Sequence, residues 1–291
     1  MDKECLKAVA DAEVAAQRFY LNVSSRFSGS SGGNRFGQNT GNSLEYLDHR
    51  EYQPGDDIRH IDWNALARSD KVTVKLFREE VTPHLDLIID ASESMQAGSP
   101  AKPKALWGLA SLLRISAQNA GYSVACWLLK DRCRRIEPAH LPLAQWPDSE
   151  LDYRGNTGMT LVSFPPKFRS QAVRIFLSDL FWEQEPMTVL QQLAHHSALL
   201  AVVQVLARVD VEPELSGNVR LIDSESLAAL ELMANEELNQ TYRRNFLRHQ
   251  EYWKRCCVKT GAVFNHCIAE DFVADYVPVE LLRSEILMAR S

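Results

Sequence analysis

Asp90, Ser92 and Ser94 alternate in a short segment that directly follows the apolar run 85–89. Four apolar residues around Asp86 make this run typical of a buried strand in a mostly parallel sheet. Open α/β sheets bind ligands at the carboxyl ends of their strands. One carboxylate and two hydroxyls at that edge are oxygen ligands of the kind that Mg²⁺ takes, together with several waters. The segment therefore predicts a metal site in which the protein supplies too little charge to neutralise the ion.

Two later loops offer further oxygen ligands. Thr160 closes the segment 158–160, which follows a break in the pattern. Asp179 follows the strand candidate 173–178, so it should emerge at the same sheet edge as Asp90. A simpler explanation is that Asp90 caps the following turn while the serines bond to loop amides. Because three loops bring Asp, Ser, Ser, Thr and Asp to one edge, we favour a six-coordinate oxygen site.

Strand and helix signals alternate from residue 85 onward. Runs rich in apolar residues mark five strand candidates, at 85–90, 123–129, 173–178, 199–206 and 262–268. Helical spacing marks helices between them: one ending near Gly121, one at 187–196 after Pro186, and a long one stopped by Gly261. This alternation predicts an α/β fold, a doubly wound, mostly parallel sheet with helices on both faces. The segment 278–288 is expected to form the last helix.

The first eighty residues look like an extension of this α/β body. Apolar residues within 6–23 follow helical spacing and predict an N-terminal amphipathic helix. Residues 24–43 are rich in Gly, Ser and Asn and predict a flexible loop, whereas alternation at 72–76 predicts a half-buried strand. We therefore divide the chain into an extension at 1–80, packed on the main body, and a main domain at 81–291.

The chain of 291 residues is 45% hydrophobic and 24% charged, which is ordinary for a soluble globular protein. Its net charge of −6 is atypical of nucleic-acid binders, which normally carry a basic face. No apolar stretch is long enough to span a bilayer, and the acidic N-terminus lacks a signal core. Six cysteines without C-x-x-C spacing favour reduced thiols. Together these features predict a cytoplasmic protein.

The three loops resemble the metal-ion-dependent adhesion site of von Willebrand factor A-like proteins, which uses D-x-S-x-S, a Thr on a second loop and an Asp on a third. Matched position by position, the metal ligands in this chain are Asp90, Ser92, Ser94, Thr160 and Asp179. The resemblance implies that the hydroxyls bind Mg²⁺ or Mn²⁺ directly, while the aspartates reach it mostly through water. Thr157 lies in a similar Gly-Asn-Thr context, so the register of the second loop stays open, with Thr160 preferred.

A block before the main domain resembles the bacterial family called domain of unknown function 58. The matching segments are Glu45-Tyr46, Tyr52–Arg59, Ile61–Trp63, Ala67-Arg68 and Val74–Glu80. The similarity covers roughly residues 20–275. The family implies a MoxR-type AAA+ ATPase as companion, and many members carry N-terminal membrane segments. This chain lacks such segments, so membrane attachment is not expected.

The chemistry expected of such a site is binding. With mostly neutral hydroxyls around it, the ion keeps much of its positive field and attracts an outside carboxylate. We therefore expect a non-enzymatic protein–protein interaction module that docks an acidic partner residue and serves as an adaptor for the ATPase. A metal-dependent phosphate-ester hydrolase is disfavoured, because Ser92 stands where a haloacid-type phosphatase needs a second Asp. A metal-free structural adaptor is the other alternative.

Overall fold

The computed structural model describes residues 1–22, 46–69, 71–77, 82–138, 140–147 and 150–290. Within these residues the chain forms two compact units. The larger unit joins the N-terminal segment to the chain from Pro83 onward, and the smaller one comprises the described residues between them. The N-terminal helix, which we had grouped with the extension, thus belongs to the larger unit. The loop expected at 24–43 lies outside the described residues. That the extension packs on the main body stays a prediction.

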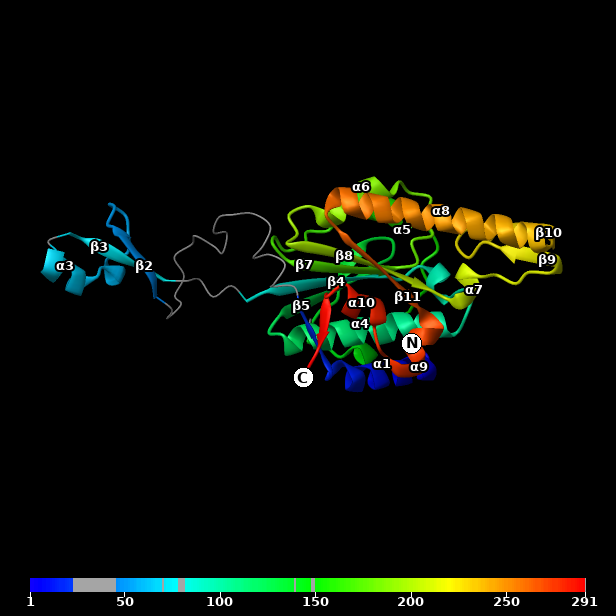
Figure 1. Cartoon of the computed structure of the whole chain (residues 1–291), viewed down its shortest axis with the longest axis horizontal. Helices are drawn as coiled ribbons and strands as arrows, with labels where there is room; N and C mark the ends of the chain where they lie inside the picture. Colours follow the sequence, from blue (N-terminus) through cyan, green and yellow to red (C-terminus); the bar gives the residue numbers. More distant parts are fainter. Residues whose placement is uncertain (23–45, 70, 78–81, 139, 148–149, 291) are drawn as a thin grey trace. The chain divides into compact units, whose positions relative to one another are not determined.

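A six-stranded sheet forms the centre of the larger unit (Figure 1). Its strands are β4 (His84–Asp90), β5 (Ser123–Leu129), β6 (Cys133–Arg135), β7 (Val173–Ser178), β8 (Leu199–Leu206) and β11 (Val263–Ile268). Their order is β11-β8-β7-β4-β5-β6, and all neighbours are parallel except β5 and β6. All five expected strands are present, so a mixed α/β fold with a mostly parallel sheet is confirmed.

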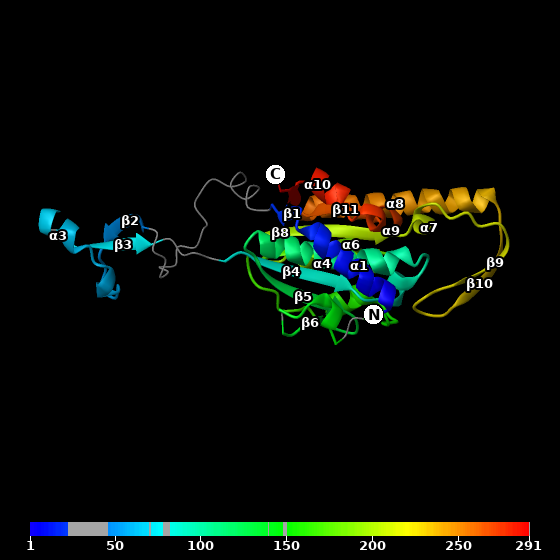
Figure 2. The same ribbon diagram turned by 90° about the horizontal axis from the view of Figure 1, so that it is seen from below.

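Helices cover both faces of this sheet (Figures 1 and 2). The first face carries α1 (Lys3–Ala16), α4 (Ala101–Asn119), α9 (Ala269–Asp275) and α10 (Val279–Arg283). The second face carries α5 (Thr157–Ser163), α6 (Pro186–Ala194) and α8 (Glu236–Thr260). The pleat of β4 explains how one strand serves both layers: Leu87 and Ile89 join one apolar cluster, and Ile88 joins the other. Because β4 is buried on both faces, its sequence is an almost continuous run of apolar residues.

The two ends of the chain differ from the expected helices. Helix α1 ends at Ala16, and β1 (Phe19–Leu21) then pairs antiparallel with β12 (Leu287–Ala289). The helix expected over 278–288 is limited to α10. Both predictions were wrong at these positions, because the strand partner that reorganises each segment lies at the opposite end of the chain. The first and last side chains of β1 are buried and the middle one is half-buried, an alternation that depends on the pairing of β1 with β12.

Shorter elements complete the larger unit. They are η2 (Glu93–Gln96), η3 (Leu143–Gln145), α7 (Arg208–Val211), and the hairpin strands β9 (Gly217–Ile222) and β10 (Ala229–Ala234). The hairpin strands pair with each other and form a sheet of their own. None of the described helices combines the length and the apolarity that a membrane span requires.

The smaller unit contains an antiparallel pair of strands. Its elements are β2 (Tyr46–Glu51), η1 (Ile58–His60), α3 (Trp63–Ser69) and β3 (Thr73–Phe77). The strand expected at 72–76 is confirmed as β3. The Arg50 guanidinium binds both carboxylate oxygens of Asp56, at 2.8 and 2.5 Å, which holds the turn after β2.

Candidate functional site

The loop after β4 is organised by the fully buried carboxylate of Asp90. Its Oδ1 accepts the N–H of Ser92 at 3.0 Å. Its Oδ2 accepts the hydroxyl of Ser178 at 2.7 Å and the indole N–H of Trp182 at 3.2 Å. The hydroxyls of Ser92 and Ser94 lie 2.9 Å apart. Asp90 therefore ties the first predicted loop to the loop after β7, at the carboxyl edge of the sheet.

A buried lysine joins the same two loops from α4. Lys102 is 1% exposed, and its ammonium donates to Asp179 Oδ2 at 2.9 Å and to the Ser94 carbonyl at 3.1 Å. A carboxylate oxygen of Asp210 lies 3.1 Å from the same ammonium. Asp179 also accepts the N–H of Phe181 through Oδ1 at 3.1 Å. Two predicted ligands from different loops, Ser94 and Asp179, thus share one cation.

The electrostatics of this cluster leave it negatively charged. Burial, and then repulsion from Asp179, raises the pKa of Asp90 to about 6. Burial alone would lower the pKa of Lys102, but the Asp179 and Asp210 carboxylates outweigh it and hold that pKa above its ordinary value. The lysine therefore stays charged and neutralises only part of the carboxylate charge. The remainder favours a further cation.

The two candidate threonines differ in whether their hydroxyls form a hydrogen bond. Both lie in α5, whose N-cap Asn156 accepts the N–H of Met159 at 2.9 Å. The Thr160 hydroxyl donates to the Asn156 carbonyl at 3.3 Å. The Thr157 hydroxyl is buried and has no hydrogen-bond partner among the described residues. A buried hydroxyl without a partner is costly, so the Thr157 oxygen is the better placed of the two to gain from a ligand.

The start of α5 lies beside the other two loops. A Cβ on Gly158 would come within 2.8 Å of Trp182 Cε3, so only glycine lets the helix approach the indole that binds Asp90. An isolated bridge also pairs Ser92 with Tyr153, shortly before α5. Segments carrying all five predicted ligands therefore converge on one region.

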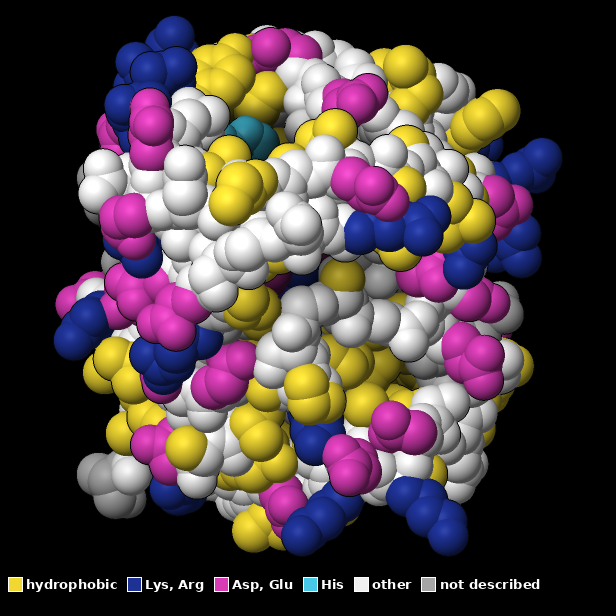
Figure 3. Space-filling view, turned by 90° about the vertical axis from the view of Figure 1, so that its right-hand side faces the viewer, with side chains coloured by type: hydrophobic (Ala, Val, Ile, Leu, Met, Phe, Trp, Pro, Cys, Tyr) yellow, Lys and Arg dark blue, Asp and Glu magenta, His cyan; other side chains and the backbone are white. Residues whose placement is uncertain are grey.

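Two charged residues at this edge were missed from the sequence, Lys102 and Asp210. Lys102 stands in the first turn of α4, where the helix dipole disfavours a cation, and this was a local sign that it pairs with carboxylates. Figure 3 faces this end of the molecule, where acidic side chains lie among exposed apolar ones around a narrow hollow.

The donor set decides which ion would suit the cluster. Among the described residues, no three His, Cys, Asp or Glu side chains come together as a metal site. The predicted ligands are instead three hydroxyls and two carboxylates, an all-oxygen set suited to Mg²⁺ or Mn²⁺. The unpartnered Thr157 hydroxyl fits the same requirement, because an ion would satisfy its lone pair.

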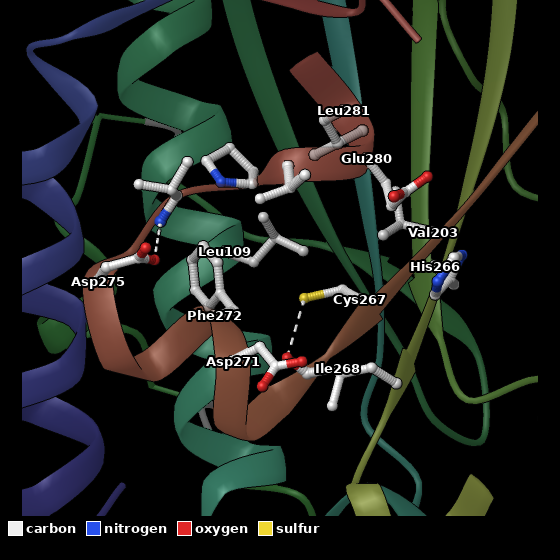
Figure 4. A pocket seen from close by; sticks show the side chains of 13 residues that line it. Leu109, Val203, His266, Cys267, Ile268, Asp271, Phe272, Asp275, Glu280 and Leu281 are labelled. Atoms are coloured by element: carbon white, nitrogen blue, oxygen red, sulfur yellow. Dashed lines mark hydrogen bonds between the residues drawn. The ribbon is translucent and has the colours of Figure 1, made fainter. Parts of the chain in front are cut away.

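A separate cavity of about 260 Å³ lies between α4, β11 and the helices near the C-terminus (Figure 4). Leu109, Phe272 and Leu281 supply apolar lining, and Asp271 and Glu280 supply carboxylates. Both carboxylates already form ion pairs with arginines. None of the five predicted ligands lines this cavity, so it is distinct from the candidate site.

The fold and the polar edge define a mixed α/β protein with a cluster of hydroxyls and carboxylates at the carboxyl ends of its strands. The chain belongs to the family described as protein of unknown function DUF58, whose model matches residues 48–252. This confirms the family resemblance that the block before the main domain indicated.

Relatives from other bacteria are similar over most of their length. Uncharacterised proteins of Mycobacterium bovis and Mycobacterium tuberculosis are each 24% identical over 284 residues, which is 92% of this chain and 89% of theirs. The conserved hypothetical protein BatB from Bacteroides thetaiotaomicron is 12% identical, with 67% of this chain and 97% of that chain covered and a TM-score of 0.32. An aerotolerance-related membrane protein from Bacteroides fragilis is 11% identical, with 69% and 99% covered and a TM-score of 0.39.

Proposed function

We propose that this protein is a non-enzymatic interaction module that binds an acidic side chain of a partner protein through a divalent ion. In this proposal the sheet is doubly wound in the manner of von Willebrand factor A-like proteins. The ion, Mg²⁺ or Mn²⁺, is held by Asp90, Ser92, Ser94, Asp179 and one threonine of α5. Because its hydroxyl has no partner among the described residues, we assign that role to Thr157 in place of Thr160.

The observation that carries the proposal is this orphan hydroxyl at the start of α5, close to a network that already connects the other four residues. Asp90 holds the first loop to the loop after β7, and Lys102 holds Ser94 to Asp179. Hydrogen bonds therefore connect the segments of the other four residues, and the buried Thr157 hydroxyl is left without a partner among the described residues. A buried polar group without a hydrogen-bond partner is expected where a bound ligand supplies that partner.

The chain's own residues explain why the site would bind and not react. Neutral hydroxyls next to the ion leave its positive field largely intact, and a partner carboxylate is attracted by that field. Lys102 positions the Ser94 carbonyl and the Asp179 carboxylate. In this proposal the ion attracts the partner carboxylate, and the three loops fix the position of the ion.

A metal-free adaptor is the second candidate, and one observation favours it. Asp179 is already paired with the ammonium of Lys102, and Asp90 accepts three hydrogen bonds. Both carboxylates therefore have partners without an ion. In this case the same edge would bind its partner through protein groups alone.

Titration of Mg²⁺ and Mn²⁺ into the whole chain by calorimetry distinguishes the two candidates. The metal-dependent module should bind either ion, and an ion at ten times its dissociation constant should add about 1.4 kcal/mol to the free energy of unfolding. Ser94→Ala should weaken binding, whereas Ser197→Ala, before β8 at the other end of the sheet, should leave it unchanged. If neither ion binds or stabilises the wild-type chain, the metal-dependent module is refuted and the metal-free adaptor is favoured.

We further propose a MoxR-type AAA+ ATPase as the partner, in the cytoplasm. The support is membership of the DUF58 family, for which the resemblance implies such a companion. A purified MoxR-type ATPase should be captured by the immobilised chain in Mg²⁺ and released by excess chelator. Capture that is equally strong in chelator would contradict the metal-dependent mechanism.

A further inference from the structure

A serine, a histidine and an aspartate meet at the amino edge of the central sheet, opposite the candidate site. His84 is the first residue of β4, and Ser123, the first residue of β5, is its direct partner in the parallel register. The hydroxyl of Ser123 lies 2.8 Å from His84 Nδ1. On the other side of the ring, Asp86 Oδ1 lies 3.3 Å from His84 Nε2. A serine is therefore joined to a histidine that is itself held by a carboxylate.

The pleat of β4 and the neighbouring strands explain this arrangement. Side chains two residues apart on a strand point to the same face of the sheet, so His84 and Asp86 share one face. Asp86 is 1% exposed, and its carboxylate meets two more polar groups there. The indole N–H of Trp127 donates to Oδ1 at 2.9 Å, and Arg174 Nε, on β7, lies 3.8 Å from Oδ2. The carboxylate is thus fixed by Trp127 and Arg174, and it holds the imidazole of His84 in one orientation.

These hydrogen bonds assign the position of the proton on neutral His84. A carboxylate only accepts hydrogen bonds, so Nε2 must carry the proton that is donated to Asp86. Nδ1 is then an acceptor, and the bond of 2.8 Å is donated by the Ser123 hydroxyl. When the imidazole is protonated, Nδ1 donates instead, and the hydroxyl donates to the Pro83 carbonyl at 3.2 Å. Neutral His84 is therefore placed to accept the hydroxyl proton of Ser123.

Ser123 is open to solvent on the side of the preceding turn. Ser123 and His84 are half-buried, while Thr82, Pro83 and Gly121, which lie close to them along the chain, are exposed. A Cβ on Gly121 would meet no atom within 4 Å among the described residues, apart from its own chain neighbours. The described part of the chain therefore leaves this approach to the hydroxyl open.

We propose that Ser123, with His84 as its base, is a nucleophile that accepts an acyl group from a small activated ester. Ser123 Oγ forms a bond to the ester carbonyl carbon while the hydroxyl proton passes to His84 Nδ1. The bond from that carbon to the leaving oxygen then breaks, and the leaving alcohol takes the proton from His84. Asp86 is a positioning residue, because it selects the tautomer that acts as base. This step modifies the chain once and is independent of the function proposed for the carboxyl edge.

Incubation of the full chain with p-nitrophenyl acetate tests the inference. Release of p-nitrophenolate gives the rate, and mass spectrometry of peptides locates the acetyl group, which hydroxylamine removes from serine esters but not from lysine amides. Ser123→Ala should abolish the ester. His84→Gln should slow its formation about a hundredfold or more, since a positioned base contributes about 10²–10⁴-fold.

Ser197→Ala is the matched control. Ser197 is half-buried and stands before β8 at the same edge of the sheet, but its hydroxyl donates to the Ala194 carbonyl at 2.9 Å. This variant should form the ester at Ser123 as fast as the wild type. Thermal unfolding of each variant checks that it is folded.

The pH profile separates a reactive site from a structural hydrogen-bond network. In the wild type the ester should form faster as the pH rises, because only the neutral imidazole of His84 accepts the proton of Ser123. Asp86→Asn removes the negative charge that faces His84 from β4, while Arg174 on β7 stays. The rise should therefore move to lower pH and the plateau should fall. If Asp86 were only structural, the position of the rise would not change.

Two results would overturn the inference. If the folded wild type forms no hydroxylamine-sensitive ester at Ser123, the three residues are a structural network only. If His84→Gln forms the ester as fast as the wild type, His84 is not the base. Should Asp86→Asn fail to fold, Ser123→Ala and His84→Gln still decide the question. Neither result affects the metal site proposed at the carboxyl edge.

Discussion

Replacing Thr157 with valine distinguishes a structural hydroxyl from a metal ligand. Valine keeps the shape of threonine and removes only Oγ1, an atom that is buried and has no partner among the described residues. An unsatisfied buried polar group costs about 1–3 kcal/mol. In excess chelator, Thr157→Val should therefore be more stable than the wild type, and a gain of about 1 kcal/mol should raise the Tm by about 2–4 °C.

The sign of the effect should reverse when an ion is present. Mn²⁺ at one hundred times its dissociation constant should stabilise the wild type by about 2.7 kcal/mol. If loss of the hydroxyl weakens binding about tenfold, the same Mn²⁺ concentration stabilises the variant by only about 1.4 kcal/mol. The ion-dependent gain should thus shrink by about 1.3 kcal/mol. Denaturant unfolding with Mn²⁺ and with chelator measures both numbers on each protein.

Thr160→Val is the matched control, because it makes the same change one turn along α5. Its hydroxyl donates to the Asn156 carbonyl, so the variant should lose about 1 kcal/mol in chelator and keep the full Mn²⁺-dependent gain. If Thr160→Val loses that gain and Thr157→Val keeps it, the assignment of the threonine is wrong. If both variants keep it, α5 supplies no ligand.

Two further substitutions test the surroundings of the site. Lys102→Met leaves the carboxylates of Asp179 and Asp210 without their ammonium, and breaking a buried pair of this kind should cost about 3–5 kcal/mol in urea unfolding with chelator. Mn²⁺ should restore part of that loss by serving as the partner of Asp179, and no restoration would favour the metal-free adaptor. Gly158→Ala places a methyl group 2.8 Å from Trp182 Cε3, so it should cost about 1–3 kcal/mol of stability and weaken Mn²⁺ binding. Unchanged stability and unchanged ion binding in this variant would show that the start of α5 does not need its close approach to the indole.

The sequence by itself determined the features that depend on neighbours along the chain. Continuous apolar runs predicted the five main strands to within a residue of their observed bounds, because burial on both faces leaves that local trace. The end of α8 was likewise predicted, since Gly261 adopts a φ of 74° that suits glycine. Asp90 and Asp179 were expected at one edge because parallel strands align their carboxyl ends, and hydrogen bonds through Ser178 and Lys102 now place them in one network.

Only the tertiary structure decided which polar groups have partners. The pairing of β1 with β12 joins the two ends of the chain and replaced the helices expected there. The same holds for Thr157 and Thr160, whose sequence contexts are alike although only one hydroxyl is left unpartnered among the described residues. The position of Lys102 in the first turn of α4 hinted at carboxylate partners, but only long-range packing shows that its ammonium joins Ser94 to Asp179. Periodicity and capping are local properties, whereas burial and hydrogen-bond satisfaction depend on segments that meet only in the folded chain.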